Sequence, residues 1–190
     1  MNNTEIKDRA AKIKMIALDN DGVLTDGKVW VDSDGQESKA YNMQDGFGVI
    51  LGRQAGIIFA IITGIKTRIV ESRAERLRIE EVHEGLTEKA EILEGIAKKY
   101  NLILDQIAYM GDDLIDLRAM KIAGLGTCPA NAQPDVKNGA DWISTHDGGK
   151  GAVRELVELI LKARGDWDQI LESYISGEAE LSIIQKNKYD

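Results

Sequence analysis

Residues 16–27 read Ile16-Ala17-Leu18-Asp19-Asn20-Asp21-Gly22-Val23-Leu24-Thr25-Asp26-Gly27. An apolar strand that ends in Asp-x-Asp-Gly places two carboxylates at the edge of a sheet, and the glycine lets the backbone turn. Side chains two residues apart on an extended segment point the same way, so Asp19 and Asp21 can face one ligand. Because close carboxylates repel unless they share a proton or a cation, the pattern indicates a Mg²⁺ site or a nucleophile beside an acid/base partner. A solvated acidic turn after a strand is the alternative interpretation.

The composition limits the classes of protein to which the chain can belong. Of its 190 residues, 43% are hydrophobic and 29% are charged, which fits one globular domain and is too short for two ordinary ones. The formal net charge of -8 argues against sequence-independent DNA binding, because that binding needs a basic face to displace counterions. A small anionic substrate remains compatible, since local cations or a metal can reverse the field in one cleft.

The same data predict a cytoplasmic protein. Cys128 is the only cysteine, which excludes an intrachain disulfide framework and suits a reducing compartment. The first 14 residues mix acids and bases, unlike a signal peptide. No apolar run approaches the roughly 20 residues of a membrane span. We therefore expect neither a membrane nor a nucleic acid among its partners.

Short apolar runs alternate with longer amphipathic stretches along the chain. Strands are predicted at residues 15–18, 57–62, 107–110 and 124–127, and helices at 66–77, 87–99, 114–123 and 151–163. Strands that are apolar on both faces and alternate with helices indicate a parallel sheet covered by helices. The predicted fold is therefore a doubly wound, Rossmann-like α/β domain with a mostly parallel sheet.

Residues 28–42 interrupt this alternation. Two short β-rich pieces, 28–31 and 39–42, flank the turn Asp32-Ser33-Asp34-Gly35, which predicts an inserted β-hairpin. We expect one domain over residues 13–164 and a C-terminal tail over 165–190. The tail carries apolar residues that either pack on their own domain or contact a neighbouring subunit: Trp167, Ile170, Leu171, Tyr174 and Ile175.

Chemically useful side chains follow the predicted strands. Ligands of an open α/β sheet bind at the carboxyl ends of its strands, so these residues should converge. They are carboxylates, a hydroxyl and an ammonium group, as phosphoryl transfer requires. In chain order they are Asp19 and Asp21, Thr63 and Gly64, Lys89 near the start of a helix, then Asp112 and Asp113 with Asp116 one helical turn on.

This set, in this order, resembles the haloacid dehalogenase superfamily of phosphatases. Residues 19–25 (DNDGVLT) resemble its first motif, Thr63-Gly64 its second, Lys89 its third and residues 111–116 (GDDLID) its fourth. The resemblance covers residues 14–163. It implies Mg²⁺-dependent hydrolysis of a phosphomonoester through an aspartyl phosphate.

Further residues are similar to the 3-deoxy-D-manno-octulosonate 8-phosphate phosphatases, which are small members without a cap domain. They are the hairpin after the first motif and residues 42–46 (NMQDG), 61–64 (IITG) and 148–155 (GGKGAVRE). The short span between Gly27 and Asp45 agrees, because it has room for a hairpin only. This family implies lipopolysaccharide precursor synthesis and a homotetramer in which the hairpins form a barrel and a neighbouring subunit, including its C-terminal segment, covers each active site.

The resemblance also implies roles in catalysis. Asp19 is the expected nucleophile, and Asp21 is the general acid and then the base that activates water. Thr63 donates its hydroxyl and Gly64 its backbone N–H to the phosphate, and Lys89 neutralises the charge of Asp19 and the phosphate.

The expected ligands of Mg²⁺ are Asp19, the backbone carbonyl of Asp21, Asp112, and Asp113 directly or through water. Asp116 either orients the ammonium group of Lys89 or caps its own helix.

The expected contacts with the sugar come from Asn42, Asp45 and Gly46, and the expected contact with its carboxylate from Arg73. Octulosonate members commonly carry arginines where this chain has Gln44, Ile50 and Ile65, and the residue between the two aspartates, here Asn20, is usually apolar. The phosphatase of a nonulosonate 9-phosphate or of another sugar phosphate is therefore the alternative function.

Three other classes of protein fit the sequence less well. A phospho-acceptor like a signalling receiver domain also uses acids, a threonine and a lysine on a doubly wound sheet, but it lacks a second acid two residues after the acceptor. A phosphomutase must protect its phosphoenzyme from water, which a domain without a cap does poorly. An inactive assembly subunit has no need of the intact set Asp19, Asp21, Thr63, Lys89 and Asp112.

Overall fold

A computed structural model describes residues 3–179 of the chain, and its centre is a six-stranded sheet in which every pairing is parallel. In spatial order the strands are β5 (Glu81–Glu84), β4 (Ile58–Thr63), β1 (Met15–Leu18), β6 (Ile107–Met110), β7 (Leu125–Cys128) and β8 (Trp142–Ile143). The predicted doubly wound, mostly parallel α/β fold is confirmed.

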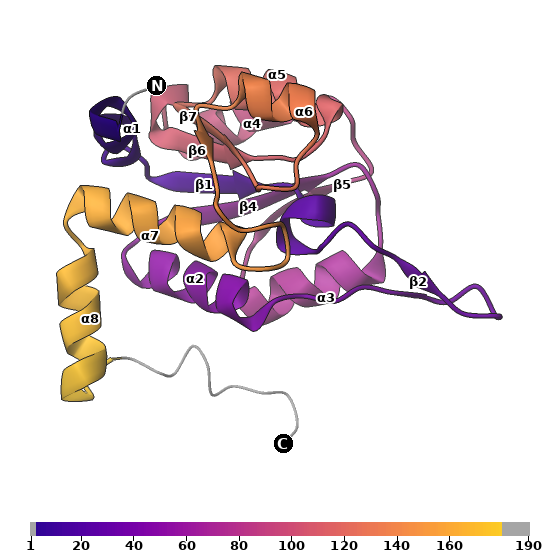
Figure 1. Cartoon of the computed structure of the whole chain (residues 1–190), viewed down its shortest axis with the longest axis horizontal. Helices are drawn as coiled ribbons and strands as arrows, with labels where there is room; N and C mark the ends of the chain where they lie inside the picture. The colour runs from indigo at the N-terminus through magenta and orange to yellow at the C-terminus, as the bar shows by residue number, and fades with distance from the viewer. Residues whose placement is uncertain (1–2, 180–190) are drawn as a thin grey trace.

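Alternate residues of each central strand enter two separate cores. In β1, Ile16 and Leu18 join one core, and Met15 and Ala17 join the other. The first face is covered by α1 (Asn3–Ala10), α2 (Met43–Gln54), α3 (Arg68–Leu77) and α7 (Ala152–Arg164). The second face is covered by α4 (Lys89–Lys99), α5 (Leu117–Ile122) and α6 (Pro134–Gly139) (Figure 1). Burial of the sheet on both faces explains why its strands read as continuous apolar runs.

The chain changes direction across the sheet at β1. It first adds β4 and β5 on one side of β1, then crosses to add β6, β7 and β8 on the other. In such a sheet the loops on the two sides of the switch point separate at the carboxyl ends and leave a crevice there. Leu18 pairs with both Ile61 and Met110, so Asp19, Thr63 and Asp112 all emerge at this one edge.

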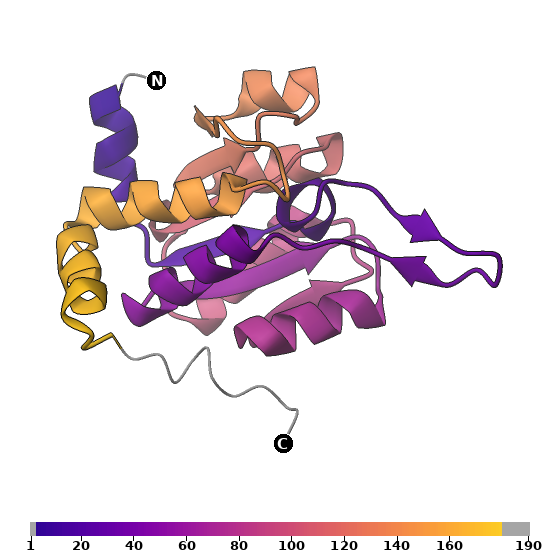
Figure 2. The same ribbon diagram turned by 60° about the horizontal axis from the view of Figure 1, so that its bottom comes forward.

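The predicted hairpin is present, but its paired part is shorter than expected. Strand β2 (Trp30–Val31) pairs antiparallel with β3 (Glu37–Ser38), and the hairpin projects away from the sheet (Figure 2). Pairing of residues 39–42 was therefore a wrong prediction. The side chain of Lys39 turns inward, where it is only 1% exposed, and the chain then runs into α2.

The described part of the tail is a helix, α8 (Trp167–Ser176), that follows α7. Trp167, Ile170 and Tyr174 pack against the first core, and the ring of Tyr174 meets that of Phe47 edge-on with centroids 5.7 Å apart. Leu171 and Ile175, by contrast, are exposed. Residues 180–190 of the predicted tail lie outside the described residues.

Helices α1, α2, α6 and α8 and strand β8 were not predicted from the sequence, and no range was predicted for β5. Helix α1 buries Ile6 and Ala10 on one side, α6 begins at a proline, and β8 adds only two residues to the sheet edge. None of the helices in residues 3–179 has the length and apolar character needed to cross a bilayer.

Candidate active site

Two other segments pack very closely against the turn that carries Asp19 and Asp21, one at Asp112 and one at Gly148. Gly22 has φ = 86°, and a Cβ there would lie 2.0 Å from the Asp112 carboxylate oxygen Oδ2. A Cβ on Gly148 would lie 1.7 Å from the carbonyl oxygen of Gly22. Glycine is therefore required at both positions, for a left-handed turn in the first case and for contact with backbone in the second. The glycine-rich stretch near residue 148 packs the turn Asn20–Leu24 from outside.

Three carboxylates gather at this edge of the sheet. Asp19, Asp112 and Asp116 each offer an oxygen, and these oxygens lie within 4.8 Å of one another. Burial, reinforced by the charge of Asp116, raises the pKa of Asp19 to about 7, although Lys89 opposes the change. Burial and the charges of Asp116 and Asp113 likewise raise the pKa of Asp112 to about 7. This excess of negative charge, offered by oxygen atoms, fits a hard divalent cation such as Mg²⁺.

Lys89 lies between two of these acids. Its Nζ is 3.0 Å from Asp19 Oδ2 and 2.7 Å from Asp116 Oδ1, and its side chain is fully buried. Burial lowers the pKa of Lys89, but the attraction of the two carboxylates outweighs this and raises the pKa overall. The side chain is therefore a fixed positive charge beside the predicted nucleophile.

Asp116 has both carboxylate oxygens engaged. Its Oδ1 accepts from Lys89 and from the Tyr109 hydroxyl at 2.7 Å, and its Oδ2 accepts from the backbone N–H groups of Asp112 (3.1 Å) and Asp113 (3.2 Å). Asp116 thus both orients Lys89 and shapes the loop after β6. Tyr109 was missed in the sequence, although a buried tyrosine in a strand requires a partner for its hydroxyl.

Asp21 sits apart from this cluster, across the turn. Its Oδ2 accepts from Lys39 Nζ at 2.7 Å, and its Oδ1 accepts from Asn20 Nδ2 at 3.0 Å. A quarter of its side chain is exposed, so the carboxylate remains accessible. Lys39 was also missed, because a lysine in a hairpin arm ordinarily points into solvent.

The other predicted phosphate ligands flank the same crevice. Thr63 ends β4 and is buried, with its hydroxyl oxygen 3.5 Å from the backbone nitrogen of Ile65. Gly64 follows, near the side chain of Ile115 and the carbonyl of Leu86. Asp113 lies outside the carboxylate cluster, is exposed, and accepts from the backbone N–H of Leu114 at 2.7 Å.

The residues predicted to touch the sugar lie at a joint, by which we mean the contact between the start of α2 and the start of α7. Asn42 caps α2 by accepting from the N–H of Gln44 at 2.7 Å. Asp45 is fully buried and accepts from the N–H groups of Gly151 (3.1 Å) and Arg154 (2.9 Å), so it caps α7. That these residues contact a sugar stays a prediction.

Arg73 belongs to the same joint. Its Nη2 donates to the carbonyl of Asn42 at 3.0 Å, its guanidinium lies 5.0 Å from the centre of the Tyr41 ring, and it packs against Gly46. Among the described residues, its buried Nε has no hydrogen-bond partner.

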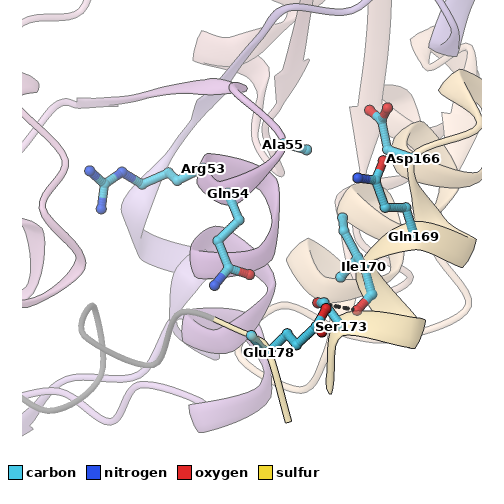
Figure 3. Close-up of a pocket in the computed structure, with 9 residues that line it drawn as sticks. Arg53, Gln54, Ala55, Asp166, Gln169, Ile170, Ser173 and Glu178 are labelled. Carbon is cyan, nitrogen blue, oxygen red and sulfur yellow. Dashed lines mark hydrogen bonds between the residues drawn. The ribbon is translucent and has the colours of Figure 1, made fainter. Parts of the chain in front are cut away.

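A cavity of about 490 Å³ lies between the end of α2 and α8 (Figure 3). Arg53, Gln54 and Ala55 line it from the end of α2, and residues of α8 line it from the opposite side. This part of α2 immediately precedes the amino end of β4, whereas the carboxylates follow carboxyl ends. The cavity is therefore separate from the site of the predicted chemistry.

Comparisons with known proteins point to one family of enzymes. The family model of the haloacid dehalogenase-like hydrolases matches residues 58–156. A 3-deoxy-D-manno-octulosonate 8-phosphate phosphatase of Salmonella typhi is 37% identical over 167 residues, which are 88% of this chain and 89% of that protein.

Two solved structures are also similar. One is the 3-deoxy-D-manno-octulosonate 8-phosphate phosphatase of Moraxella catarrhalis in complex with a magnesium ion, a phosphate ion and KDO; it is 42% identical, with a TM-score of 0.89 over 91% of this chain and 99% of that one. The other is the cobalt-bound deoxy-D-mannose-octulosonate 8-phosphate phosphatase of Haemophilus influenzae, which is 35% identical with a TM-score of 0.80 over 83% of this chain and 92% of that one.

Proposed function

Because the chain belongs to the haloacid dehalogenase-like hydrolases and, among them, to the 3-deoxy-D-manno-octulosonate 8-phosphate phosphatase family, we propose that it hydrolyses this sugar phosphate to the free sugar acid and inorganic phosphate. The reaction is a phosphoric monoester hydrolysis that depends on Mg²⁺ and serves lipopolysaccharide precursor synthesis. The observation that carries the proposal is the buried Lys89 between Asp19 and Asp116, beside Asp112, at the carboxyl ends of the strands.

The first half-reaction transfers the phosphoryl group to the protein. Asp19 attacks phosphorus, the bond from phosphorus to the sugar oxygen breaks, and Asp21 gives its proton to the departing oxygen. The Thr63 hydroxyl, the Gly64 N–H and the Lys89 ammonium group hold the phosphate oxygens as charge moves onto them.

The second half-reaction returns the protein to its starting state. Asp21 takes a proton from water, the water oxygen attacks phosphorus, and the bond to Asp19 breaks with its electron pair returning to the carboxylate. Asp19, Asp112 and the carbonyl of Asp21 would hold Mg²⁺, with Asp113 bound directly or through water, and the ion supplies positive charge against the phosphate oxygens.

The substrate is a small phosphorylated sugar acid. Arg73, with its free Nε in the joint at the start of α2, is our proposed partner of the sugar carboxylate, and Asn42, Asp45 and Gly46 are the proposed neighbours of the sugar. Gln44 and Ile65 are exposed and cannot supply the two-pronged hydrogen bonds of an arginine. A nonulosonate 9-phosphate is therefore the second candidate.

For the assembly we propose a cytoplasmic homotetramer of a domain spanning residues 13–164 with the tail 165–190. The support is the row of exposed apolar side chains on the projecting hairpin, Val29, Trp30 and Val31, which no ordinary monomer surface needs. Leu171 and Ile175 leave α8 an apolar face for a neighbouring subunit.

Measured phosphate release tests the activity. The purified protein should be assayed with Mg²⁺ on the octulosonate 8-phosphate, a nonulosonate 9-phosphate and a neutral hexose phosphate, with the Asp19→Asn variant as the blank. We expect the highest kcat/KM on the octulosonate substrate and no release after chelation. A higher kcat/KM on the hexose phosphate would overturn the substrate, and full activity without metal would overturn the mechanism.

A further inference from the structure

The carboxylate of Asp21 is held on both of its oxygens. Lys39 Nζ donates to Oδ2 at 2.7 Å, and Asn20 Nδ2 donates to Oδ1 at 3.0 Å, while the Thr25 hydroxyl lies 3.5 Å from Oδ1. These donors leave the carboxylate little freedom to rotate. Because both oxygens accept hydrogen bonds, the plane and the direction of the carboxylate are fixed.

Tyr41 fixes the direction in which Asn20 donates. The Tyr41 hydroxyl donates to Asn20 Oδ1 at 3.0 Å, so the amide must turn its NH₂ group toward Asp21. Burial and the nearby charge of Asp21 raise the pKa of Tyr41 to about 12, which keeps the hydroxyl protonated as a donor. The Arg73 guanidinium lies over the face of the same ring.

These polar groups occupy buried positions, where an apolar side chain would carry a smaller free-energy penalty of desolvation. Asn20 is fully buried, and the side chain of Lys39 is 1% exposed although it belongs to a projecting hairpin. Burying an amide or an ammonium group is unfavourable unless each is paired. Here both are paired with the same carboxylate, which indicates a task at that carboxylate.

We propose that Lys39, Asn20 and Tyr41 form a polar clamp that holds Asp21 in the pose for proton transfer from water. The three are positioning residues, because each is argued to act through the Asp21 carboxylate. Lys39 and Tyr41 lie on the segment that leads from the hairpin back to α2, so the base of the hairpin becomes part of the active site. This proposal rests on the role given to Asp21 under the proposed function.

The step affected is hydrolysis of the aspartyl phosphate. Water attacks phosphorus, its proton passes to the Asp21 carboxylate, and the bond from phosphorus to Asp19 breaks with the electron pair returning to Asp19. With an aryl phosphate the first half-reaction needs no proton, because the phenolate leaves unaided. A misplaced Asp21 should therefore slow only the second half-reaction, and phosphorylated protein should accumulate.

The experiment follows p-nitrophenolate release by wild type and variants after rapid mixing of p-nitrophenyl phosphate and Mg²⁺. For Lys39→Met we expect a burst near one equivalent per site, then a steady rate lower by at least about tenfold, a fraction of a full acid–base contribution. KM should not rise, and Lys39→Arg should recover part of the rate. The matched control is Lys28→Met, because Lys28 lies on the outgoing arm with 71% of its side chain exposed.

Tyr41→Phe supplies a milder variant that keeps the ring and removes only the hydroxyl. It should show a smaller burst, with an unchanged melting temperature as evidence of folding. The clamp is overturned if Asp21→Asn gives the burst while folded Lys39→Met and Tyr41→Phe behave as wild type, or if these two only raise KM. Near-wild-type turnover of Asp21→Asn would instead overturn the role of Asp21 in the proposed function.

Discussion

Asp19 and Asp112 lie with Asp116 around a single lysine, and the stability of the protein should report this imbalance of charge. The pKa values of Asp19 and Asp112, about 7 in the folded protein, lie above the unfolded value of about 4. The folded state therefore binds a proton on each of these two carboxylates more tightly than the unfolded state does. The stability gained from protonation is therefore full below about pH 4 and is lost as the pH rises through about 7. Without metal, the protein should melt at a lower temperature at pH 8 than at pH 5.5.

Added Mg²⁺ should offset this loss, since it binds the ionised carboxylates. The rise in Tm on replacing chelator with Mg²⁺ should be larger at pH 8 than at pH 5.5, as scanning calorimetry can measure. Asp112→Asn should shrink the difference. An equal rise at both pH values would contradict the assignment of these carboxylates as metal ligands.

Substitution of Asp19 and of Asp21 should lower the turnover of the protein to different extents. Asp19→Asn removes the nucleophile, and we expect no detectable phosphate release on the sugar phosphate. Asp21→Asn removes proton transfer and should lower turnover by at least about 10²-fold. Circular dichroism should show both variants folded, and near-normal turnover of Asp19→Asn would place the nucleophile elsewhere.

Among the secondary-structure elements, α7 depends on a residue of another helix. Asp45 in α2 accepts from two N–H groups at the start of α7, which has no side-chain cap of its own. Asp45→Ala should cost about 0.5–2 kcal/mol of unfolding free energy, as for other lost caps, and more if the freed N–H groups stay buried. Urea titration measures it. Asp147→Ala, at an exposed ion pair, is the control and should change stability little.

The sequence predicted the central elements well because their signal is local. Strands β1 and β6 match the prediction to the residue, and β4 and β7 are displaced by one. The hairpin arm at 39–42 was wrong because its alternation serves contacts with the active-site turn instead of a partner strand. Strand β8 has too few residues to show a period.

The site residues also divide into those with a local signal in the sequence and those that depend on contacts of the folded chain. Asp19, Thr63 and Asp112 follow strands, so the topology of a parallel sheet suffices to bring them together. Lys39 and Tyr109 are paired by contacts that only the folded chain creates. No spacing in the sequence connects residue 39 with residue 21.

At the scale of the whole molecule, the hairpin should decide the assembly. Trp30 is 70% exposed on β2, and a tetramer built through the hairpins would bury it. Trp30→Glu should therefore shift the protein to smaller species in light scattering coupled to size exclusion, while Lys28→Glu on the exposed neighbouring position should change the mass less. A wild-type protein that is monomeric at all concentrations would contradict the proposed tetramer.

The close approach of Gly148 to Gly22 also bears on how the protein is made. Every residue assigned to the chemistry lies within the first 116, so a ribosome releases them all before it releases Gly148. The turn around Gly22 is nevertheless completed by later contacts, from Gly148 and from Gly149, whose N–H donates to the carbonyl of Val23 at 2.9 Å. A nascent chain thus carries its full catalytic set around an unfinished turn until Gly148 and Gly149 have emerged and folded back.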